Sequence, residues 1–192
     1  IGSLLPVKGF DTLISALAAG VRQGQRWRLW LAGAGSEQES LEALAKLEGV
    51  ADRVHFLGFR KDIGDLLSAA DLMVSASHFE GLSLVLIEAM LVGCPLVATP
   101  VGGNREALGI DHSGRSSLAV PFPPGKINRL VSALKEGLRR EPAERRAKQA
   151  QVWAEQNFTV ERMAERHLAT YERLVGGSSN VDETLPRRSQ AA

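Results

Sequence analysis

Residues 71–99, DLMVSASHFEGLSLVLIEAMLVGCPLVAT, contain in succession a short apolar segment, a loop, an apolar helical segment and a second short apolar segment. Asp71–Ala76 and Pro95–Thr99 are rich in β-branched and large apolar residues, which is typical of strands covered on both faces. Leu82–Val92 between them has the length and composition of a helix. A strand, a helix and a second strand in this order form a crossover unit, and such units predict a parallel sheet.

The same alternation of strands and helices continues on both sides of this stretch. Further strands are predicted at Trp27–Ala32, Arg53–Leu57 and Ser117–Val120, with the tail of an earlier strand at Ile1–Leu4. The other predicted helices are Phe10–Arg22, Glu37–Leu47, Ile63–Ala70, Asn104–Leu108, Ile127–Arg139, Pro142–Gln156 and Val160–Leu174. We therefore expect an α/β fold with a parallel sheet, helices on both faces and a helical C-terminal section.

Length and composition indicate one globular domain. The chain has 192 residues, of which 44% are hydrophobic, enough to bury a core of its own. Its 23 basic and 22 acidic residues are well mixed, so no strong field points to a nucleic-acid partner. Residues 1–174 form the expected domain, and residues 175–192 are expected to be a disordered tail because they are polar and lack periodicity. The upstream half of the first strand is missing, so we expect the chain to be a piece of a longer protein.

The single cysteine and the hydropathy pattern bear on the compartment. Cys94 lies in an apolar stretch, which suits a reduced and buried thiol and favours a cytoplasmic protein. There is no run of eighteen apolar residues and no leader with a charged segment followed by an apolar one. We therefore expect neither a membrane span nor a signal peptide.

The loop after Asp71–Ala76 is the richest in candidate functional residues. Ligands of open parallel sheets bind beyond the carboxyl ends of the strands. Glu88 is the only charged residue from Gly81 to Pro95, so we expect a buried carboxylate that needs partners, such as the hydroxyls of a ligand ribose. Gly81 allows a sharp turn that leaves the amides of Leu82–Val85 free for a pyrophosphate. Alternatively, Glu88 bonds a neighbouring backbone group or an arginine, and Glu80 is simply an acid near a helix start.

Other loops at the same edge carry glycines and two basic residues. Lys8–Gly9 places an ammonium where it could neutralise a phosphate, although most loop lysines are only solvated. Gly33–Ser36 lacks the third glycine of a dinucleotide fingerprint and is interpreted as a tight turn beside the ligand. Gly58–Arg60 is predicted either to lie along a base or to be an ordinary turn. Gly102–Gly103 is predicted to bring backbone close to a ligand.

Taken together, these segments resemble the C-terminal half of a retaining glycosyltransferase of the GT-B fold, in the large family 4 group. The resemblance covers Gly2 to about Leu174 and rests on several motifs in matching order. Glu80 and Glu88 match the E-x7-E motif, and Pro6–Asp11 resembles the first loop of the group. The remaining matches are Val54–Phe59, Ala69–Asp71 and Val101–Glu106. The resemblance implies a Rossmann-like domain that is one half of a GT-B fold.

The resemblance also implies roles for individual residues. A sugar would pass from a nucleotide diphosphate donor to an acceptor with retained configuration. Lys8 and Glu80 would act at the catalytic centre, Lys8 on the diphosphate and Glu80 on the hydroxyls of the donor sugar. Glu88 would bind the ribose, and Gly33 would lie beside the ligand. The amides of Leu82 and Ser83 would meet the sugar, those of Leu84 and Val85 the phosphates, and Gly58, Phe59 and Arg60 the base.

The implied substrate is a nucleotide-diphosphate sugar in its UDP, GDP or ADP form, with no cofactor and no metal. Ser3 stands where many members carry an arginine that joins the lysine on the diphosphate. The acceptor, a sugar or a lipid-linked sugar, would be held by an absent N-terminal domain, so the isolated domain is expected to turn over little. Relatives with lipid-linked acceptors suggest peripheral association with the inner face of the membrane, and Arg139–Lys148 is a candidate contact. The acids among these basic residues favour a solvated helix face instead.

Two other classes of function remain open. The first is a non-catalytic module that binds a nucleotide sugar or serves as a scaffold. The second is a sugar-nucleotide epimerase or a phosphorylase with the same architecture, which would require an acid/base residue or a cofactor lysine that this sequence does not contain.

Overall fold

The computed structural model describes residues 1–175, which fall into two units, Ile1–Gln156 and the segment from Asn157 onward. The α/β class is confirmed, and every strand pair in the described residues is parallel. The strands are β1 (Leu29–Ala32), β2 (Val54–Gly58), β3 (Met73–Ser75), β4 (Leu96–Ala98) and β5 (Val120–Pro121). Each lies at or within one residue of its predicted range except β5, which begins at the last residue of the range predicted for it.

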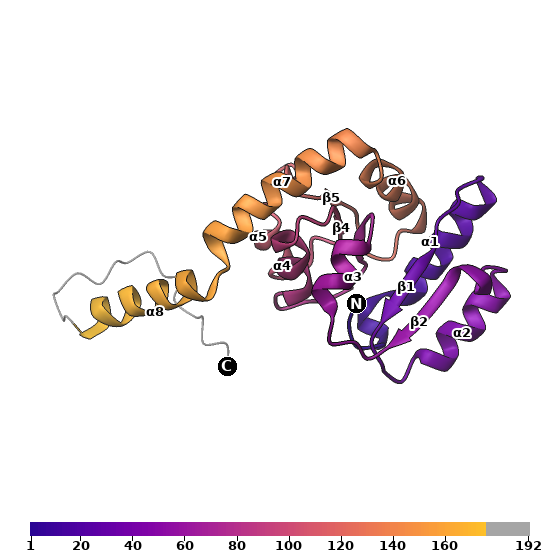
Figure 1. Ribbon diagram of the computed structural model, residues 1–192, viewed down its shortest axis with the longest axis horizontal. Coiled ribbons are helices and arrows are strands. Elements are labelled where there is room, and N and C mark those ends of the chain that lie inside the picture. Colours follow the sequence, from indigo (N-terminus) through magenta and orange to yellow (C-terminus); the bar gives the residue numbers. More distant parts are fainter. Residues whose placement is uncertain (176–192) are drawn as a thin grey trace, which may run out of the picture. The chain divides into compact units, whose positions relative to one another are not determined.

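The strands form two separate sheets instead of the one expected sheet (Figure 1). One sheet pairs β1 with β2, and the other has the order β3-β4-β5. The predicted strand tail at Ile1–Leu4 is not a strand in the structure. The amides of Gly2 and Leu4 nevertheless donate to the carbonyls of Ala32 and Ala34 at 2.9 and 3.0 Å, so this segment extends alongside the end of β1.

The helices follow the predicted order. Within the first unit lie α1 (Phe10–Arg22), α2 (Gln38–Leu47), α3 (Ile63–Ala69), α4 (Leu84–Leu91), α5 (Asn104–Ala107), α6 (Ile127–Gly137) and α7 (Arg140–Asn157), the last ending one residue beyond it. Short 3₁₀ turns occupy Pro6–Lys8 and Ala51–Arg53. In the second unit α8 spans Val160–Val175, so Val175 is helical, contrary to the predicted tail. The rest of that tail, residues 176–192, lies outside the described residues.

The core of the first unit forms around α1, which packs against α2 and α6. Its buried side chains repeat at helical spacing and include Leu13, Ile14 and Leu17, because these positions share one face. Val97 of β4 and Leu130 of α6 are fully buried in the same cluster. This packing holds the carboxyl ends of the strands and the turn before α1 in fixed positions.

Two further predictions concern burial and hydropathy. Cys94 is a free and buried thiol, as predicted. Burial, followed by a small effect of Asp71, raises the pKa of its thiol to about 11 despite an opposing backbone hydrogen bond. Among residues 1–175, no helix combines the length and the apolar character that crossing a membrane requires.

Candidate functional site

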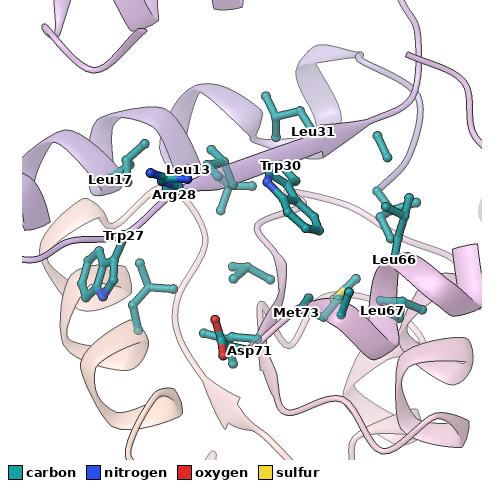
Figure 2. Close-up of a pocket in the computed structure, with 18 of the residues that line it drawn as sticks. Leu13, Leu17, Trp27, Arg28, Trp30, Leu31, Leu66, Leu67, Asp71 and Met73 are labelled. Atoms are coloured by element: carbon teal, nitrogen blue, oxygen red, sulfur yellow. The ribbon is translucent and has the colours of Figure 1, made fainter. Parts of the chain in front are cut away.

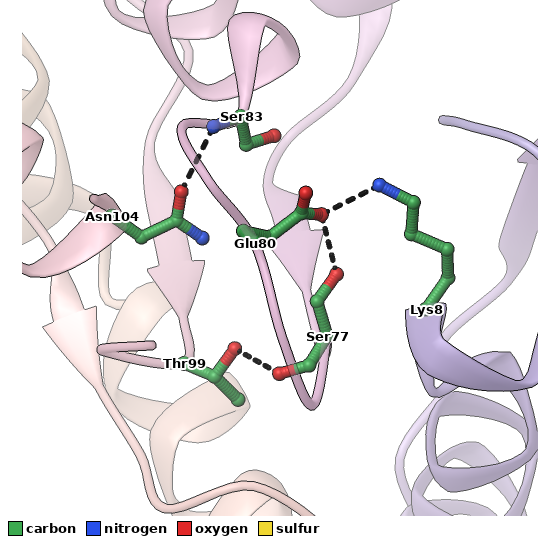
Figure 3. A network of polar contacts seen from close by, with 6 residues as sticks. All are labelled: Lys8, Ser77, Glu80, Ser83, Thr99 and Asn104. Atoms are coloured by element: carbon green, nitrogen blue, oxygen red, sulfur yellow. Dashed lines mark hydrogen bonds and ion pairs between the residues drawn. The ribbon is translucent and has the colours of Figure 1, made fainter. Parts of the chain in front are cut away.

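Lys8 and Glu80 form an ion pair at the carboxyl end of β3. Lys8 Nζ donates to Glu80 Oε1 at 2.7 Å, and Ser77 Oγ donates to the same oxygen at 2.8 Å (Figure 3). The side chains of Lys8 and Glu80 are 27% and 12% exposed. A carboxylate with so little access to water requires such partners, and this one has a cation and a hydroxyl.

The turn that carries Lys8 is fixed directly against the end of β3. The amide of His78 donates to the carbonyl of Val7 at 2.8 Å. Gly9 has φ 65°, and a Cβ at that position would collide with the carbonyl oxygen of Ala76. Glycine is required here because the conformation is left-handed and the two backbones touch. The side chain of Lys8 is therefore held beside Glu80 by backbone contacts.

The loop between β3 and α4 is anchored from the far side by β4. Thr99, which is fully buried, donates from Oγ1 to the carbonyl of Ser77 at 2.7 Å. The amide of Thr99 donates to the carbonyl of Ser75 at 2.9 Å. Ser77 thus has its backbone bound to β4 while its hydroxyl orients Glu80 (Figure 3).

The amino end of α4 lies in the same loop. The helix begins at Leu84, two residues later than predicted, so Leu82 is an exposed loop residue. The amide of Ser83 donates to Asn104 Oδ1 at 3.0 Å, so it is already bound in this structure. No side chain caps the helix, and the amides of Leu84 and Val85 have no acceptor within it.

Asn104 is fully buried, and its amide nitrogen has no hydrogen-bond partner, the one such buried side-chain atom among the described residues. Gly102 and Gly103, just before it, approach the backbone of Glu80 and Gly81. The amide of Gly103 donates to the carbonyl of Gly81 at 2.7 Å. These glycines therefore allow the loop of Glu80 to approach closely, and the expectation that they bring backbone close to a ligand stays a prediction.

The predicted burial of Glu88 is also wrong, because its side chain is exposed. Leu84, Glu88 and Val92 follow one another at intervals of four residues and share the exposed face of the α4 segment. The other faces are buried through Leu86, Ile87, Ala89 and Met90. The sequence of α4 has only one charged residue because most of the helix is buried and its exposed face is itself mostly apolar. Glu80 is therefore the shielded carboxylate and Glu88 the exposed one.

The ends of β1 and β2 present a second group of predicted residues. Gly33 donates its amide to the carbonyl of Gly58 at 2.7 Å, which joins the two loops. Phe59 is 76% exposed, as an aromatic ring available for stacking would be. Arg60 pairs with Asp62 on the surface. The hydrogen bond and charge of this pair raise the pKa of Arg60 and lower that of Asp62.

A small hollow gathers part of the predicted site. Lys8, Ser77, Glu80 and Ser83 all line it, whereas Glu88 and Phe59 do not. Ser77, Thr99 and Asn104 were missed by the sequence analysis. Ser77 directly follows a predicted strand, Thr99 is the last residue of another, and Asn104 directly follows Gly102–Gly103. These positions are the signal that could have identified them. Among residues 1–175, no group of three or more His, Cys, Asp or Glu side chains could hold a metal ion.

Comparison with known proteins gives consistent matches. Residues 1–140 match the family described as Glycosyl transferases group 1. The lipopolysaccharide glucosyltransferase WaaG of Escherichia coli K12 is 33% identical over 132 residues, which are 68% of this chain and 35% of WaaG. The 2-deoxystreptamine glucosyltransferase of Streptomyces kanamyceticus is 30% identical over 178 residues, 92% of this chain and 45% of the relative. This chain thus spans less than half the length of these relatives.

A solved structure agrees in fold. Anabaena Alr3699/HepE in complex with UDP superposes with a TM-score of 0.80 at 30% identity, over 90% of this chain and 47% of that one. The same protein in complex with UDP-glucose gives a TM-score of 0.79 at 30% identity, with the same coverage. The Rossmann-like half of a GT-B fold, predicted from the sequence, is confirmed by these neighbours.

Proposed function

The chain belongs to the glycosyl transferases group 1 family, and from this membership we propose that it is the donor-binding domain of a retaining glycosyltransferase. It binds a nucleotide-diphosphate sugar, whose sugar passes to an acceptor held by a separate N-terminal domain. The observation that carries this proposal is the contact of Lys8 with Glu80 beside the uncapped amino end of α4. One cation, one carboxylate and free amides are the groups that a sugar diphosphate requires.

The diphosphate lies between Lys8 and α4. The amides of Leu84 and Val85 have no intrahelical acceptor and point out of the positive end of the helix. Lys8 is 27% exposed, so its ammonium can contact a phosphate without leaving the turn that holds it. Backbone amides and a lysine together bind the charge of the diphosphate.

The two carboxylates bind different hydroxyls. Glu80, with Oε1 already bound to Lys8 and Ser77, accepts hydrogen bonds from the donor sugar at its other oxygen. Glu88 is exposed on α4 one turn after Leu84, so a ribose next to the diphosphate can contact it. The exposure of Glu88 suits this role better than the predicted burial, because a ligand must contact the carboxylate directly. Gly58, Phe59 and Arg60 lie along the base.

Cleavage of the glycosidic bond develops negative charge on the leaving diphosphate and positive charge on the sugar. Preorganised donors at the diphosphate are the main source of catalysis in such a reaction. The acceptor enters on the face from which the diphosphate leaves, so configuration is retained and Glu80 is not a nucleophile. In this scheme Lys8 and α4 supply the positive charge that a metal ion would otherwise provide.

The donor nucleotide is proposed to be UDP, because Alr3699/HepE, at 30% identity, has been solved with UDP and with UDP-glucose. GDP and ADP forms are the alternatives to be tested. The acceptor is a sugar or a lipid-linked sugar, a class suggested by the lipopolysaccharide glucosyltransferase among the relatives. The protein is proposed to be cytoplasmic, in keeping with the free thiol of Cys94, and to meet lipid-linked acceptors at the inner face of the membrane.

Calorimetric titration of the 192-residue chain with UDP, GDP and ADP tests the proposal. Lys8→Ala and Glu88→Ala are expected to weaken binding of the preferred nucleotide about tenfold each, the size of one lost charge-assisted hydrogen bond. Lys46→Ala, an exposed change on α2, is the matched control and should leave binding unchanged. Absence of binding for all three nucleotides would favour the scaffold alternative.

Turnover is expected to require the N-terminal domain. The 192-residue chain should bind donor without transferring sugar at an appreciable rate, whereas the longer protein should do both. Full transfer activity in the isolated chain would contradict the assignment of acceptor binding to another domain.

A further inference from the structure

The backbone amide of Ser83, expected from the sequence to meet the donor sugar, is already occupied in the structure. It donates to Asn104 Oδ1 at 3.0 Å, and Asn104 is fully buried. The amide of Gly103 donates to the carbonyl of Gly81 at 2.7 Å, so a second bond joins the same two loops. Releasing the Ser83 amide to a ligand would leave a buried acceptor unpaired, which costs stability.

The hydroxyl of Ser83, in contrast, is free. Ser83 is the N-cap residue of α4 with φ −80° and ψ 108°, a position where serine usually accepts a hydrogen bond from the first turn. It makes no such bond, and among residues 1–175 its Oγ has no hydrogen-bond partner. Figure 3 shows the hydroxyl on the side of Ser83 that faces Glu80 and Lys8, away from Asn104.

Ser83 lines the small hollow of the candidate site together with Lys8, Ser77 and Glu80. The volume of this hollow is about 10 Å³, which is the room that one water-sized group needs. Such a group is stable there only if it hydrogen-bonds to polar neighbours. Because Glu80 Oε1 is bound to Lys8 and Ser77, the other oxygen of Glu80 remains as an acceptor and Ser83 Oγ as a donor.

A larger cavity in the first unit does not offer this chemistry. It lies between β1 and β3 and has a volume of about 410 Å³ (Figure 2). Its lining is mostly apolar and includes Trp30 of β1 and Met73 of β3. Lys8, Glu80 and Ser83 do not line it. Most hydroxyls of a sugar placed there would lack partners, so the small hollow suits a sugar hydroxyl better.

We propose that the hydroxyl of Ser83 binds one hydroxyl of the donor sugar in this hollow, and that Asn104 is the positioning residue that turns Ser83 toward it. The sugar hydroxyl donates to the free oxygen of Glu80 and accepts from Ser83 Oγ, so its hydrogen and one of its lone pairs are both used. The inference rests on the proposed function and deepens it. Ser83 and Glu80 together select a nucleotide-linked sugar that carries a hydroxyl at this position, because a deoxy sugar would leave both partners unpaired.

The side chain of Asn104 suits the positioning role because it is neutral. Its oxygen must face the Ser83 amide, so its amide nitrogen is left buried without a partner, at a cost in stability. An aspartate could accept the same hydrogen bond without that cost. It would also place a further negative charge near Glu80 and near a bound diphosphate, and the charges would repel each other.

Titrations of the 192-residue chain with UDP-glucose and with UDP test the contact with Ser83. In Ser83→Ala and Ser83→Gly the Kd for UDP-glucose should rise about fivefold to tenfold, the effect of one lost hydrogen bond, while the Kd for UDP should change by less than about twofold. Both variants should unfold at the temperature of the unmodified chain, because Ser83 makes no capping bond that they could lose. Ser132→Ala, which removes an exposed hydroxyl of α6, is the matched control and should change nothing.

Amide hydrogen exchange, measured by NMR, tests the role of Asn104. The Ser83 amide should exchange slowly with and without UDP-glucose, and about tenfold faster in Asn104→Ala, which lacks the acceptor. Asn104→Ala should also weaken binding of UDP-glucose more than binding of UDP. Asn104→Asp keeps the acceptor and should keep the slow exchange, but its charge should weaken binding of both ligands about threefold.

The outcomes separate this inference from the proposed function. Equal weakening of UDP and UDP-glucose in the Ser83 variants would mean that the hydroxyl contacts the diphosphate, and would overturn the inference. Unchanged binding of UDP-glucose in both variants would overturn it too. So would loss of the slow exchange at Ser83 when UDP-glucose is added, since the amide would then be the sugar contact. If the unmodified chain bound neither ligand, the proposed function would fail, and this inference with it.

Discussion

The ion pair of Lys8 with Glu80 makes a prediction in which stability and nucleotide affinity change in opposite directions. The carboxylate is 12% exposed and the ammonium 27%, so the pair lies between a surface pair and a buried one. Glu80→Gln keeps the shape and the oxygen that accepts from Lys8 and Ser77, but removes the charge. We expect the free energy of unfolding to fall by about 1–2 kcal/mol, between the values for surface and buried pairs.

The same substitution should strengthen binding of UDP. Glu80 neutralises Lys8 in the free protein and repels a phosphate bound to it. At about 6 Å and an effective dielectric constant of about 20, that repulsion amounts to about 3 kcal/mol. Screening by water and salt leaves about 1 kcal/mol. Glu80→Gln should therefore bind UDP about fivefold more tightly, whereas Lys8→Met should bind it more weakly.

Urea unfolding measures the stability and an NMR titration measures the affinity, with Glu155→Gln on the exposed surface of α7 as the control. The control should leave both quantities unchanged. If Glu80→Gln bound UDP more weakly than the unmodified chain, with its fold intact, Lys8 and Glu80 would not lie at the diphosphate and the reasoning would fail.

Three further predictions concern the supports of the site and the core. Asn104→Ala leaves the Ser83 amide without its acceptor and should lower the free energy of unfolding by about 1–3 kcal/mol in urea titrations; an unchanged value would mean that this hydrogen bond is not formed in solution. Gly102→Ala, where φ is 51° and a Cβ meets the loop of Glu80, should cost more stability than Gly114→Ala, where φ is 78° and the space is open; equal thermal shifts would contradict the contact. The raised pKa of Cys94, about 11 against 9.0 for a free thiol, means that the folded state holds its proton longer. The contribution of this thiol to stability should therefore be full below about pH 9 and fall by about 3 kcal/mol as the pH rises through 11, a contribution that Cys94→Ala should lack in the same urea series.

The sequence alone predicted the element order because alternating strand and helix patterns are local. The bounds of α1 were predicted to the residue, since its apolar face and the flanking Gly9 are both evident in the sequence. The division of the strands into two sheets, β1-β2 and β3-β4-β5, was not predicted, because it depends on which strands are neighbours in space. The order of residue types along the chain does not show whether the edges of β1 and β3 are hydrogen-bonded to each other.

In the candidate site, too, local features were predicted from the sequence and contacts between distant segments were not. Lys8 and Glu80 were both predicted to be functional residues, but their direct contact was not foreseen, because it depends on how closely two distant loops approach. Glu88 was expected to be buried because its helix has no other charge. In the structure α4 exposes one face, formed by Leu84, Glu88 and Val92, although Glu88 is its only charged residue. The composition of the helix therefore did not predict which face is exposed. Asn104 is a buried polar residue whose role depends on a partner 21 residues away in sequence.

The most direct test of the proposed donor site is a crystal structure of the chain with UDP-glucose. We expect a diphosphate bound by Lys8 Nζ and the amides of Leu84 and Val85, with the ribose hydroxyls on Glu88 and the sugar on Glu80. A nucleotide bound elsewhere, for example in the cavity beside Trp30, with Lys8 and Glu80 still paired only to each other and to Ser77, would contradict it.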